Sequence, residues 1–289
     1  DDKETASRMV QSMLSYEFGQ IYMKNHCTAA IINDVKNMVN EIRNVYKLRL
    51  EANNWLSPET RGKAVDKLNS LRVFVGGPAA DDKPIIESMP DVISPKDGGD
   101  LLANVMHNGV LEKQQVHALL GKDFNPDKWY AFDPQDVNAA YIPENNSITI
   151  PAGILQPPFY DAKASRGANL GGIGVVIGHE ISHAFDPNGS KYDSEGRLKN
   201  WWNKKDYEAF QKLSAAFGPY YDAYPLGQGL HENGKLVSNE AIADCGGLSV
   251  ATELAHGDEG TLRDLYRTFA TVFATKMTDQ LLLYLVQND

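Results

Sequence analysis

The chain has 289 residues, with 28 lysine and arginine residues against 38 aspartate and glutamate residues, which gives a formal net charge of −10. Hydrophobic residues make up 42% of it and charged residues 23%, a globular composition that excludes a disordered or collagen-like chain. The acidic balance argues against nucleic acid as a partner, and no apolar run in the sequence approaches the roughly 20 residues that span a bilayer.

The two cysteines, Cys27 and Cys245, allow one disulfide at most, so the chain is not a disulfide scaffold. It begins at Asp1 with neither an initiator methionine nor a signal peptide. We therefore expect a processed piece, or a part cut from something longer. The cysteine count does not decide the compartment.

The first part of the chain is predicted to be helical. Between residues about 4 and 24 apolar residues recur at helical spacing, and between about 29 and 50 the pattern is clearer. The two stripes consist of Met9, Met13, Tyr16 and Ile21, and of Ile31, Val35, Met38, Ile42, Val45 and Arg49. We interpret both stripes as core packing.

A third helix is predicted to begin at Ser57. This residue can cap the helix, Pro58 suits the first helical position, and Glu59 places an acid in the first turn. The helix is expected to end near residues 76–78. The residues that it buries are expected to be Ala64, Leu68 and Leu71.

The next part of the chain changes character twice. Residues 76–99 are rich in proline, glycine and aspartate, which is typical of a long surface crossing or a domain junction, and a helix from about 100 to 120 follows. Residues 141–151 then predict a β-hairpin with a turn at 144–146. Pro151 closes its second strand and favours an edge position for that strand.

A zinc-binding motif follows an apolar, glycine-flanked segment. In His179-Glu180-Ile181-Ser182-His183, positions i and i+4 share one helix face, so both imidazoles can reach one ion at about 2.0–2.1 Å. Glu180 lies beside the metal, where it can take a proton from an activated water and pass it to the leaving amine. Two surface histidines on an ordinary helix are the alternative, which the apolar setting disfavours because uncompensated polar groups there are costly.

The third zinc ligand is expected on a second helix. The metzincin pattern needs glycine at 186 and histidine at 189, but the chain has Asp186 and Gly189, so that class is excluded. Ser238 or Asn239 can cap a helix that carries Glu240 and Asp244 four residues apart, on one face. One of these acids can bind zinc while the other accepts the outer N–H of a ligating histidine. A solvated acidic face is the alternative, and the surrounding alanine, isoleucine, cysteine and glycine residues disfavour it.

Several other segments accompany these two motifs in order. They are Val137–Tyr141, Ile148–Phe159, His179–Gly189, Asn200–Trp202 and Glu240–Leu248, with weaker similarity over Trp55–Leu71 and Phe269–Phe273. Together they resemble the neprilysin and endothelin-converting-enzyme family of zinc metallopeptidases, in its bacterial oligoendopeptidase O branch.

The resemblance implies a zinc endopeptidase that cuts peptides on the amino side of bulky apolar residues. It makes Glu180 the general base, Asp244 the partner that orients His179, and Asp186 the partner that orients His183. One zinc ion per chain is implied as cofactor. Its implied ligands are His179, His183 and Glu240.

The implied partner is a peptide substrate. Asn138 and Ala139 would hold its backbone as an added strand, which agrees with a strand edge at this position. The apolar pocket for the residue after the cut would be formed by Ile154, Phe159, Val175, Val176 and Val272.

Members of this family are more than twice as long as this chain. They have an N-terminal helical half that caps the active site and, shortly after the equivalent of Leu285, a His-x-Pro segment and an arginine that stabilise the tetrahedral intermediate. We therefore expect a catalytic portion without the capping half and the C-terminal tail. Losing one such donor typically costs about 10²–10³ in rate, so a zinc- and peptide-binding fragment with little or no turnover is the alternative function. An aminopeptidase would need acids for the free amino terminus, and no such motif is visible.

The expected fold is mainly α with a small β-sheet (α+β), as in the thermolysin-like zincins whose third ligand is glutamate. Two zinc-bearing helices form its centre, and an edge strand faces the cleft. We expect a helical segment over residues 1–76, a junction and helix over 77–128, and a zinc-binding catalytic core over 129–289 that is truncated at its C-terminal end.

Overall fold

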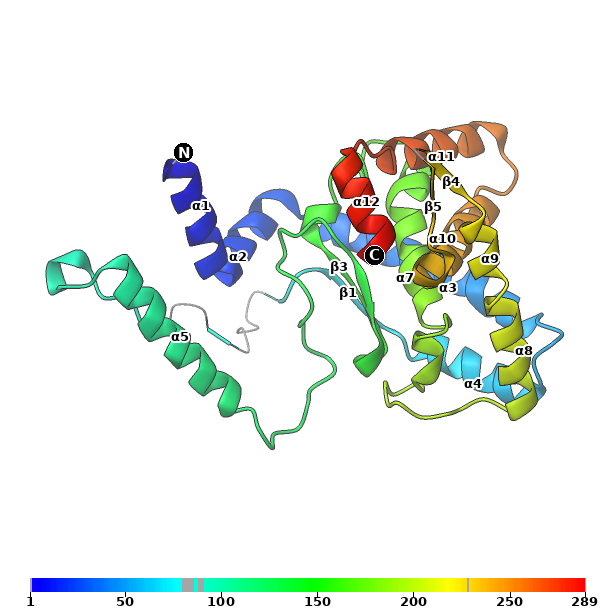
Figure 1. Ribbon diagram of the computed structural model, residues 1–289, viewed down its shortest axis with the longest axis horizontal. Coiled ribbons are helices and arrows are strands. Elements are labelled where there is room, and N and C mark those ends of the chain that lie inside the picture. Colours follow the sequence, from blue (N-terminus) through cyan, green and yellow to red (C-terminus); the bar gives the residue numbers. More distant parts are fainter. Residues whose placement is uncertain (1, 80–85, 88–90, 228, 289) are drawn as a thin grey trace.

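A computed structural model describes residues 2–79, 86–87, 91–227 and 229–288. Helices dominate the described chain, and a small sheet lies beside the main helical body, as expected (Figure 1). In the first half the helices are α1 (Asp2–Met13), α2 (Ser15–His26), α3 (Ala29–Glu51), α4 (Pro58–Asn69) and α5 (Leu101–His117). In the second half they are α6 (Arg166–Asn169), α7 (Val175–His183), α8 (Lys204–Ser214), α9 (Phe217–Asp222), α10 (Gly234–Leu254), α11 (Glu259–Val272) and α12 (Asp279–Asn288).

The strands form one three-stranded sheet and one short pair. The strands are β1 (Arg72–Gly76), β2 (Ala140–Ile142), β3 (Ser147–Pro151), β4 (Pro225–Gly227) and β5 (Leu230–His231). In the larger sheet β3 is central, pairing parallel with β1 and antiparallel with β2, and β4 pairs antiparallel with β5. A π-helical turn, η4 (Leu170–Gly174), lies between α6 and α7.

The first apolar stripe is not part of the core, which corrects the interpretation made from its spacing. The predicted helix is broken at Leu14, whose φ of −119° and ψ of 43° leave the helical region, and α1 contains no buried residue. Ile21 is exposed. Helix α1 projects from the main body (Figure 1), so its apolar residues lack a second layer to pack against, whereas Tyr22 and Met23 near the end of α2 do pack against the core.

The second and third helices follow the sequence pattern, except that Arg49 of the second stripe lies outside the core and pairs with Glu253. α3 begins after Thr28, whose side chain accepts a hydrogen bond from the Ile31 N–H, and Ser57 caps α4 by accepting from the Thr60 N–H. α4 ends at Asn69 rather than near residue 76. The residues after it form β1, a strand that the sequence analysis missed although Val73 and Val75 are typical of strands.

The predicted junction over 76–99 falls partly outside the described residues, at 80–85 and 88–90. α5 begins where expected, with Asp100 accepting a hydrogen bond from the Ala103 N–H. It extends away from the main body on the side opposite to α8 and α9 (Figure 1).

The predicted hairpin is present as β2 and β3. Its turn places Asn146 in the left-handed region at φ 47°. The expected edge position of the second strand is wrong, because β1 pairs with the other side of β3. Pro151 fits there as the last residue of β3. The two edge strands are β1 and β2, and β2 faces the cleft described below.

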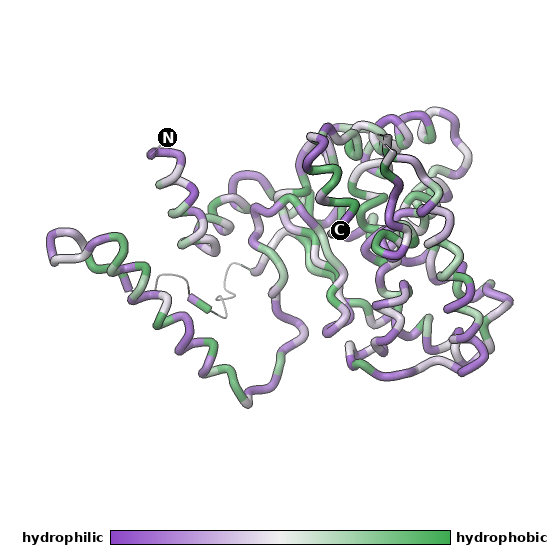
Figure 2. Tube along the Cα trace, in the orientation of Figure 1, coloured by the Kyte–Doolittle hydropathy of each residue, from purple (hydrophilic) through white to green (hydrophobic). Residues whose placement is uncertain are grey.

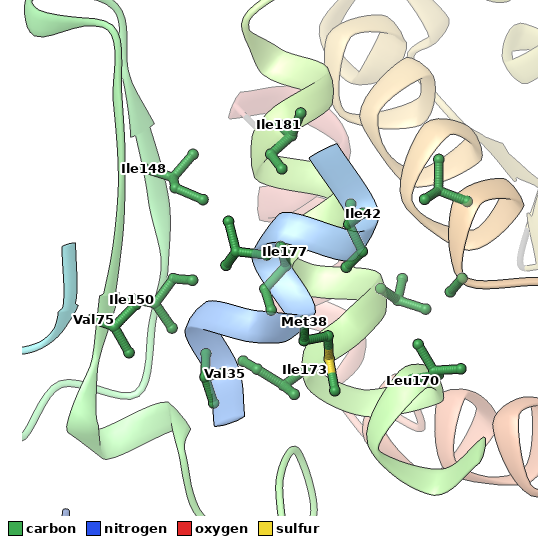
Figure 3. Packing of buried hydrophobic residues seen from close by; sticks show 14 of the residues in the cluster. Val35, Met38, Ile42, Val75, Ile148, Ile150, Leu170, Ile173, Ile177 and Ile181 are labelled. Atoms are coloured by element: carbon green, nitrogen blue, oxygen red, sulfur yellow. The ribbon is translucent and has the colours of Figure 1, made fainter. Parts of the chain in front are cut away.

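The core lies between this sheet, α3 and the run from η4 into α7. Figure 3 shows Ile148 and Ile150 of β3 facing the region that α3 and α7 fill, and Figure 2 shows the hydrophobic character of the same elements. The buried residues labelled in Figure 3 are Val35, Met38, Ile42, Val75, Ile148, Ile150, Leu170, Ile173, Ile177 and Ile181. The core therefore holds α7 from one side.

Two further predictions concern single features. Cys27 and Cys245 are both free, so the one disulfide that the count allowed is not formed. Within the described ranges, no helix combines the length and the apolar character needed to cross a membrane.

Candidate metal centre

α7 and α10 approach each other at a pair of glycines. A Cβ atom added to Gly178 would lie 2.7 Å from the Gly247 Cα, and one added to Gly247 would lie 2.5 Å from the Val175 carbonyl oxygen and 2.7 Å from the His179 nitrogen. Only glycine allows the two backbones to come this close. The contact brings the histidines of α7 opposite the acids of α10.

α10 begins four residues before the predicted cap. Gly234 is its first residue, and the Asn233 side chain caps it by accepting a hydrogen bond from the Leu236 N–H. Ser238 and Asn239 therefore lie within the helix. The predicted shared face holds, because both Glu240 and Asp244 are turned toward α7, where they contact its histidines.

Each histidine is held at Nδ1 by a carboxylate. His179 Nδ1 lies 2.8 Å from Asp244 Oδ1, and His183 Nδ1 lies 2.7 Å from Asp186 Oδ2. A carboxylate acceptor places the proton of a neutral imidazole on Nδ1 and leaves the lone pair on Nε2. The two Nε2 atoms are 2.9 Å apart. Glu240 Oε2 lies 3.2 Å from His179 Nε2 and 3.5 Å from His183 Nε2.

Asp186 belongs to the loop that follows α7. Its side chain is buried, and its Oδ1 accepts hydrogen bonds from the Asn188 and Gly189 N–H groups at 2.7 Å each. The other oxygen faces His183. The carboxylate thus fixes the fold of its own loop and the orientation of the imidazole together.

Glu180 lies beside this group. It is 6% exposed, and its Oε2 accepts a hydrogen bond of 2.8 Å from the Tyr141 N–H of β2. Burial raises the pKa of Glu180, while His179, His183 and the Tyr141 N–H oppose that rise. Ligand atoms of Glu180 and of both histidines lie within 4.8 Å of one another.

The charges of the group fit a divalent cation. Burial lowers the pKa of His179 and of His183, but Asp244 and Glu240 raise the first to about 9, and Asp186 and Glu240 raise the second to about 10. The pKa of Glu240 is lowered by its hydrogen bonds to the two histidines. Protons thus bind strongly where two Nε2 atoms and a carboxylate oxygen converge. Two imidazoles and one carboxylate are also a donor set that zinc takes in catalytic sites.

A cavity of about 400 Å³ opens onto these groups. The predicted substrate residues Asn138 and Ala139 line it, followed by Ala140 and Tyr141 of the edge strand. The lining residues from the metal centre are His179, Glu180, His183, Asp186 and Glu240. An edge strand therefore does face the cleft.

The predicted apolar pocket residues lie elsewhere. Ile154 and Val175 are buried in the core, Phe159 and Val176 pack against it, and Val272 is half-buried on α11. None of the five is among the residues that line the cavity. Their part in binding a substrate side chain stays a prediction.

Sequence reasoning missed the contacts that backbone groups make with the site. The N–H groups of Tyr141, Asn188 and Gly189 hold Glu180 and Asp186, and side-chain identity does not reveal such donors. It also missed Lys67, which lies at the helical spacing of the apolar stripe on α4, between Ala64 and Leu71. A charged residue on a predicted core face was the available signal.

Comparison with known proteins agrees with the resemblance seen in the sequence. The model of peptidase family M13 matches residues 138–287, more than half of the chain, and a second model of the same family matches residues 1–78. A neutral endopeptidase of Lactobacillus helveticus is 34% identical over 285 residues, which are 98% of this chain and 43% of that protein.

Solved structures give the same result. The crystal structure of PEPO from Lactobacillus rhamnosis HN001 matches with a TM-score of 0.87 at 36% identity, over 96% of this chain and 44% of that one. The zinc metalloprotease ZMP1 of Mycobacterium tuberculosis, in complex with an inhibitor, matches with a TM-score of 0.85 at 31% identity, over 100% of this chain and 45% of that one. The chain thus spans less than half the length of each of these relatives.

Proposed function

The chain belongs to peptidase family M13, and on that premise we propose that it forms the catalytic centre of a zinc-dependent endopeptidase. The observation that carries the proposal is the convergence of two imidazole Nε2 atoms and the Glu240 carboxylate, with the buried Glu180 beside them. Relatives named neutral endopeptidase and zinc metalloprotease support it.

One zinc ion per chain is proposed, held by the Nε2 atoms of His179 and His183 and by the Glu240 carboxylate. When bound there, zinc supplies Lewis acidity that polarises a peptide carbonyl and makes water acidic at neutral pH. Asp244 and Asp186 keep each ligating histidine in the tautomer with its lone pair on Nε2.

Glu180 is the proposed general base and then general acid. Its carboxylate takes a proton from the attacking water and passes it to the nitrogen of the departing amine. The Tyr141 N–H fixes one oxygen of Glu180, which leaves the other free to accept that proton. The raised pKa that burial gives Glu180 helps the second transfer, because a weaker carboxylic acid is a better proton carrier near neutral pH.

The proposed substrate is a peptide lying along β2. Asn138 and Ala139 precede this edge strand and line the cavity, so an extended peptide can add to the strand there. We propose cleavage on the amino side of bulky apolar residues. The side chain after the cut would be held by Ile154, Phe159, Val175, Val176 and Val272.

The test is the Glu180→Gln variant, assayed on a peptide with one bulky apolar residue. Glutamine keeps the shape but cannot accept the proton, so hydrolysis is expected to fall by about 10²–10⁴. Bound zinc, measured by elemental analysis, is expected to stay equal to that of the parent protein, since Glu180 is not a proposed ligand.

Glu253→Gln is the matched control. Glu253 is an exposed acid on α10 that pairs with Arg49, away from the cavity, so its loss should leave both readouts unchanged. Parental activity in Glu180→Gln would show that Glu180 is not the base. Loss of zinc in that variant would show that it serves as a ligand.

A second candidate is zinc and peptide binding by this chain with little or no turnover. The observation that favours it is the coverage of 43% to 45% of the relatives' length. Comparing this chain with a chain of the relatives' full length on one peptide separates the two candidates. Comparable kcat values support the first, and peptide binding without turnover by this chain alone supports the second.

A further inference from the structure

Lys67 is a buried cation on α4, outside the group of proposed ligands. Its side chain is 1% exposed, and Nζ donates hydrogen bonds to three carbonyl oxygens, of Ala184 at 2.8 Å, Gly189 at 2.7 Å and Tyr192 at 2.7 Å. All three acceptors belong to residues 184–192, which we name the post-α7 loop. Lys67 therefore links this loop to α4 by hydrogen bonds.

The number of acceptors matches the charged form of the side chain. An ammonium group has three N–H donors and no acceptor, so three carbonyl oxygens satisfy it completely, whereas a neutral amine has one donor fewer. The rings of Tyr141, Phe185 and Trp201 lie 5.8 to 5.9 Å from Nζ and surround it. Aromatic faces at this distance attract a cation.

The loop held by Lys67 is the one that positions a proposed zinc ligand. Between two of the fastened carbonyls lies Asp186, whose carboxylate accepts from His183 Nδ1 and from the N–H groups of Asn188 and Gly189. Asp186 is part of the loop and binds its backbone N–H groups, whereas Lys67 belongs to α4 and binds its backbone carbonyl oxygens. Releasing the Lys67 contacts leaves the Asp186 carboxylate free to shift relative to His183.

This arrangement is costly for stability. Burial lowers the pKa of Lys67 to about 7, although Asp186 and Asp193 act in the opposite direction. An apolar side chain of similar volume fills such a position without that cost. The three contacts thus give the loop a defined position at the expense of folding free energy.

We infer that Lys67 is a positioning residue for the metal centre, which fixes the post-α7 loop and, through Asp186, the orientation of the His183 imidazole. This inference rests on the proposed function, because it takes His183 as a zinc ligand. Lys67 itself makes no hydrogen bond to the proposed ligands and does not line the cavity, although Gly189, whose carbonyl it binds, does.

The experiment compares the zinc dissociation constants of the parent protein, Lys67→Met and Leu68→Ala, measured by competition with a chromophoric chelator. Loss of an outer hydrogen-bonding partner of a metal site typically costs about 10–100-fold in affinity, and that range is expected for Lys67→Met. Leu68 is fully buried on the same helix and is not bonded to the loop, so Leu68→Ala lowers the thermal unfolding midpoint while zinc affinity stays at the parental value.

The absorption spectrum of the cobalt-substituted protein separates positioning from general stability. Lys67→Met is expected to shift the cobalt d–d bands, which report ligand geometry, and Leu68→Ala to leave them in place. If the methionine variant does not fold, Lys67→Gln is measured in its place, because glutamine offers two N–H donors to the three carbonyl oxygens. Its zinc affinity and its cobalt spectrum are expected to lie between those of the parent protein and those of the methionine variant.

The outcomes distinguish the inference from the function beneath it. If the folded Lys67 variants bind zinc with parental affinity and give the parental cobalt spectrum, Lys67 does not position the site, although the proposed function stands. If Leu68→Ala weakens zinc binding as much as Lys67→Met, the effect is one of stability and the inference is wrong. If the parent protein binds no zinc, the proposed function itself fails.

Discussion

At the scale of the residue, the histidines of the centre are defined by their carboxylate partners. Asp244 and Asp186 bind Nδ1 of His179 and His183 in the same way, although one is half-exposed on a helix and the other is buried in a loop. The i,i+4 spacing of the histidines and of the acids on α10 could be predicted from sequence, since a helix fixes which positions share a face. Lys67 could not be assigned that way, because its partners are backbone carbonyls more than 100 residues away.

A pH dependence follows from the buried charge of Lys67. Its pKa is about 7 in the folded protein, against 10.5 as the ordinary value that applies when the chain is unfolded. Between these two values the unfolded chain binds a proton that the folded chain does not, so the free energy of unfolding rises with pH. Below pH 7 the amine of Lys67 is charged in both states, and burying that charge lowers the free energy of unfolding by its full amount. Above pH 7 the buried amine loses its proton, so this loss of stability becomes progressively smaller.

The measurement is the difference in unfolding free energy between the parent protein and Lys67→Met, determined by urea denaturation from pH 6 to pH 9. Subtraction removes the titration of all other groups that behave alike in both proteins. Above pH 7 the free energy of unfolding of the parent protein is expected to rise relative to that of Lys67→Met, by up to about 1.4 kcal/mol per pH unit. A difference that is flat over this range contradicts a lowered pKa for Lys67.

At the scale of the element, the packing of α7 on α10 decides whether the ligands meet. Gly178 and Gly247 let the two backbones touch. In Gly247→Ala the new Cβ would meet the Val175 carbonyl and the His179 nitrogen, and such overpacking costs typically about 1–3 kcal/mol. We expect lower stability and weaker zinc binding, because the helices must separate.

Gly62→Ala is the control for this variant. Gly62 lies within α4, and an added Cβ there meets nothing within 4 Å. Alanine in a helix interior is favoured over glycine by about 1 kcal/mol, so the control should gain stability and bind zinc normally. Thermal unfolding and chelator competition check both variants. A Gly247→Ala protein that is as stable as the control would contradict close helix contact.

Elements were predicted best where a local signal sets them. Ser57 and Asp100 mark helix starts through their own side chains, and the turn before Ser147 marks the hairpin. β1 was missed because five residues after a helix carry little periodic signal, and its parallel partner lies more than 70 residues away. That one missing strand also produced the wrong edge assignment for β3.

At the scale of the whole molecule, the mainly helical fold with a small sheet is what the sequence indicated, and membership of peptidase family M13 agrees with it. The apolar stripe of α1 and α2 is the exception. Periodicity predicts a helix with one apolar face but not what covers that face, and the described chain leaves α1 without a buried residue. The division into parts at residues 76 and 128 stays a prediction.

The central claim is that two helices of this chain hold one zinc ion. The most direct test is crystallography of the zinc-loaded protein with data collected on both sides of the zinc absorption edge. We predict a single anomalous peak about 2.0–2.2 Å from His179 Nε2, His183 Nε2 and a Glu240 carboxylate oxygen. A peak elsewhere on the chain, or one at this place without Glu240 among its ligands, would contradict the proposed centre.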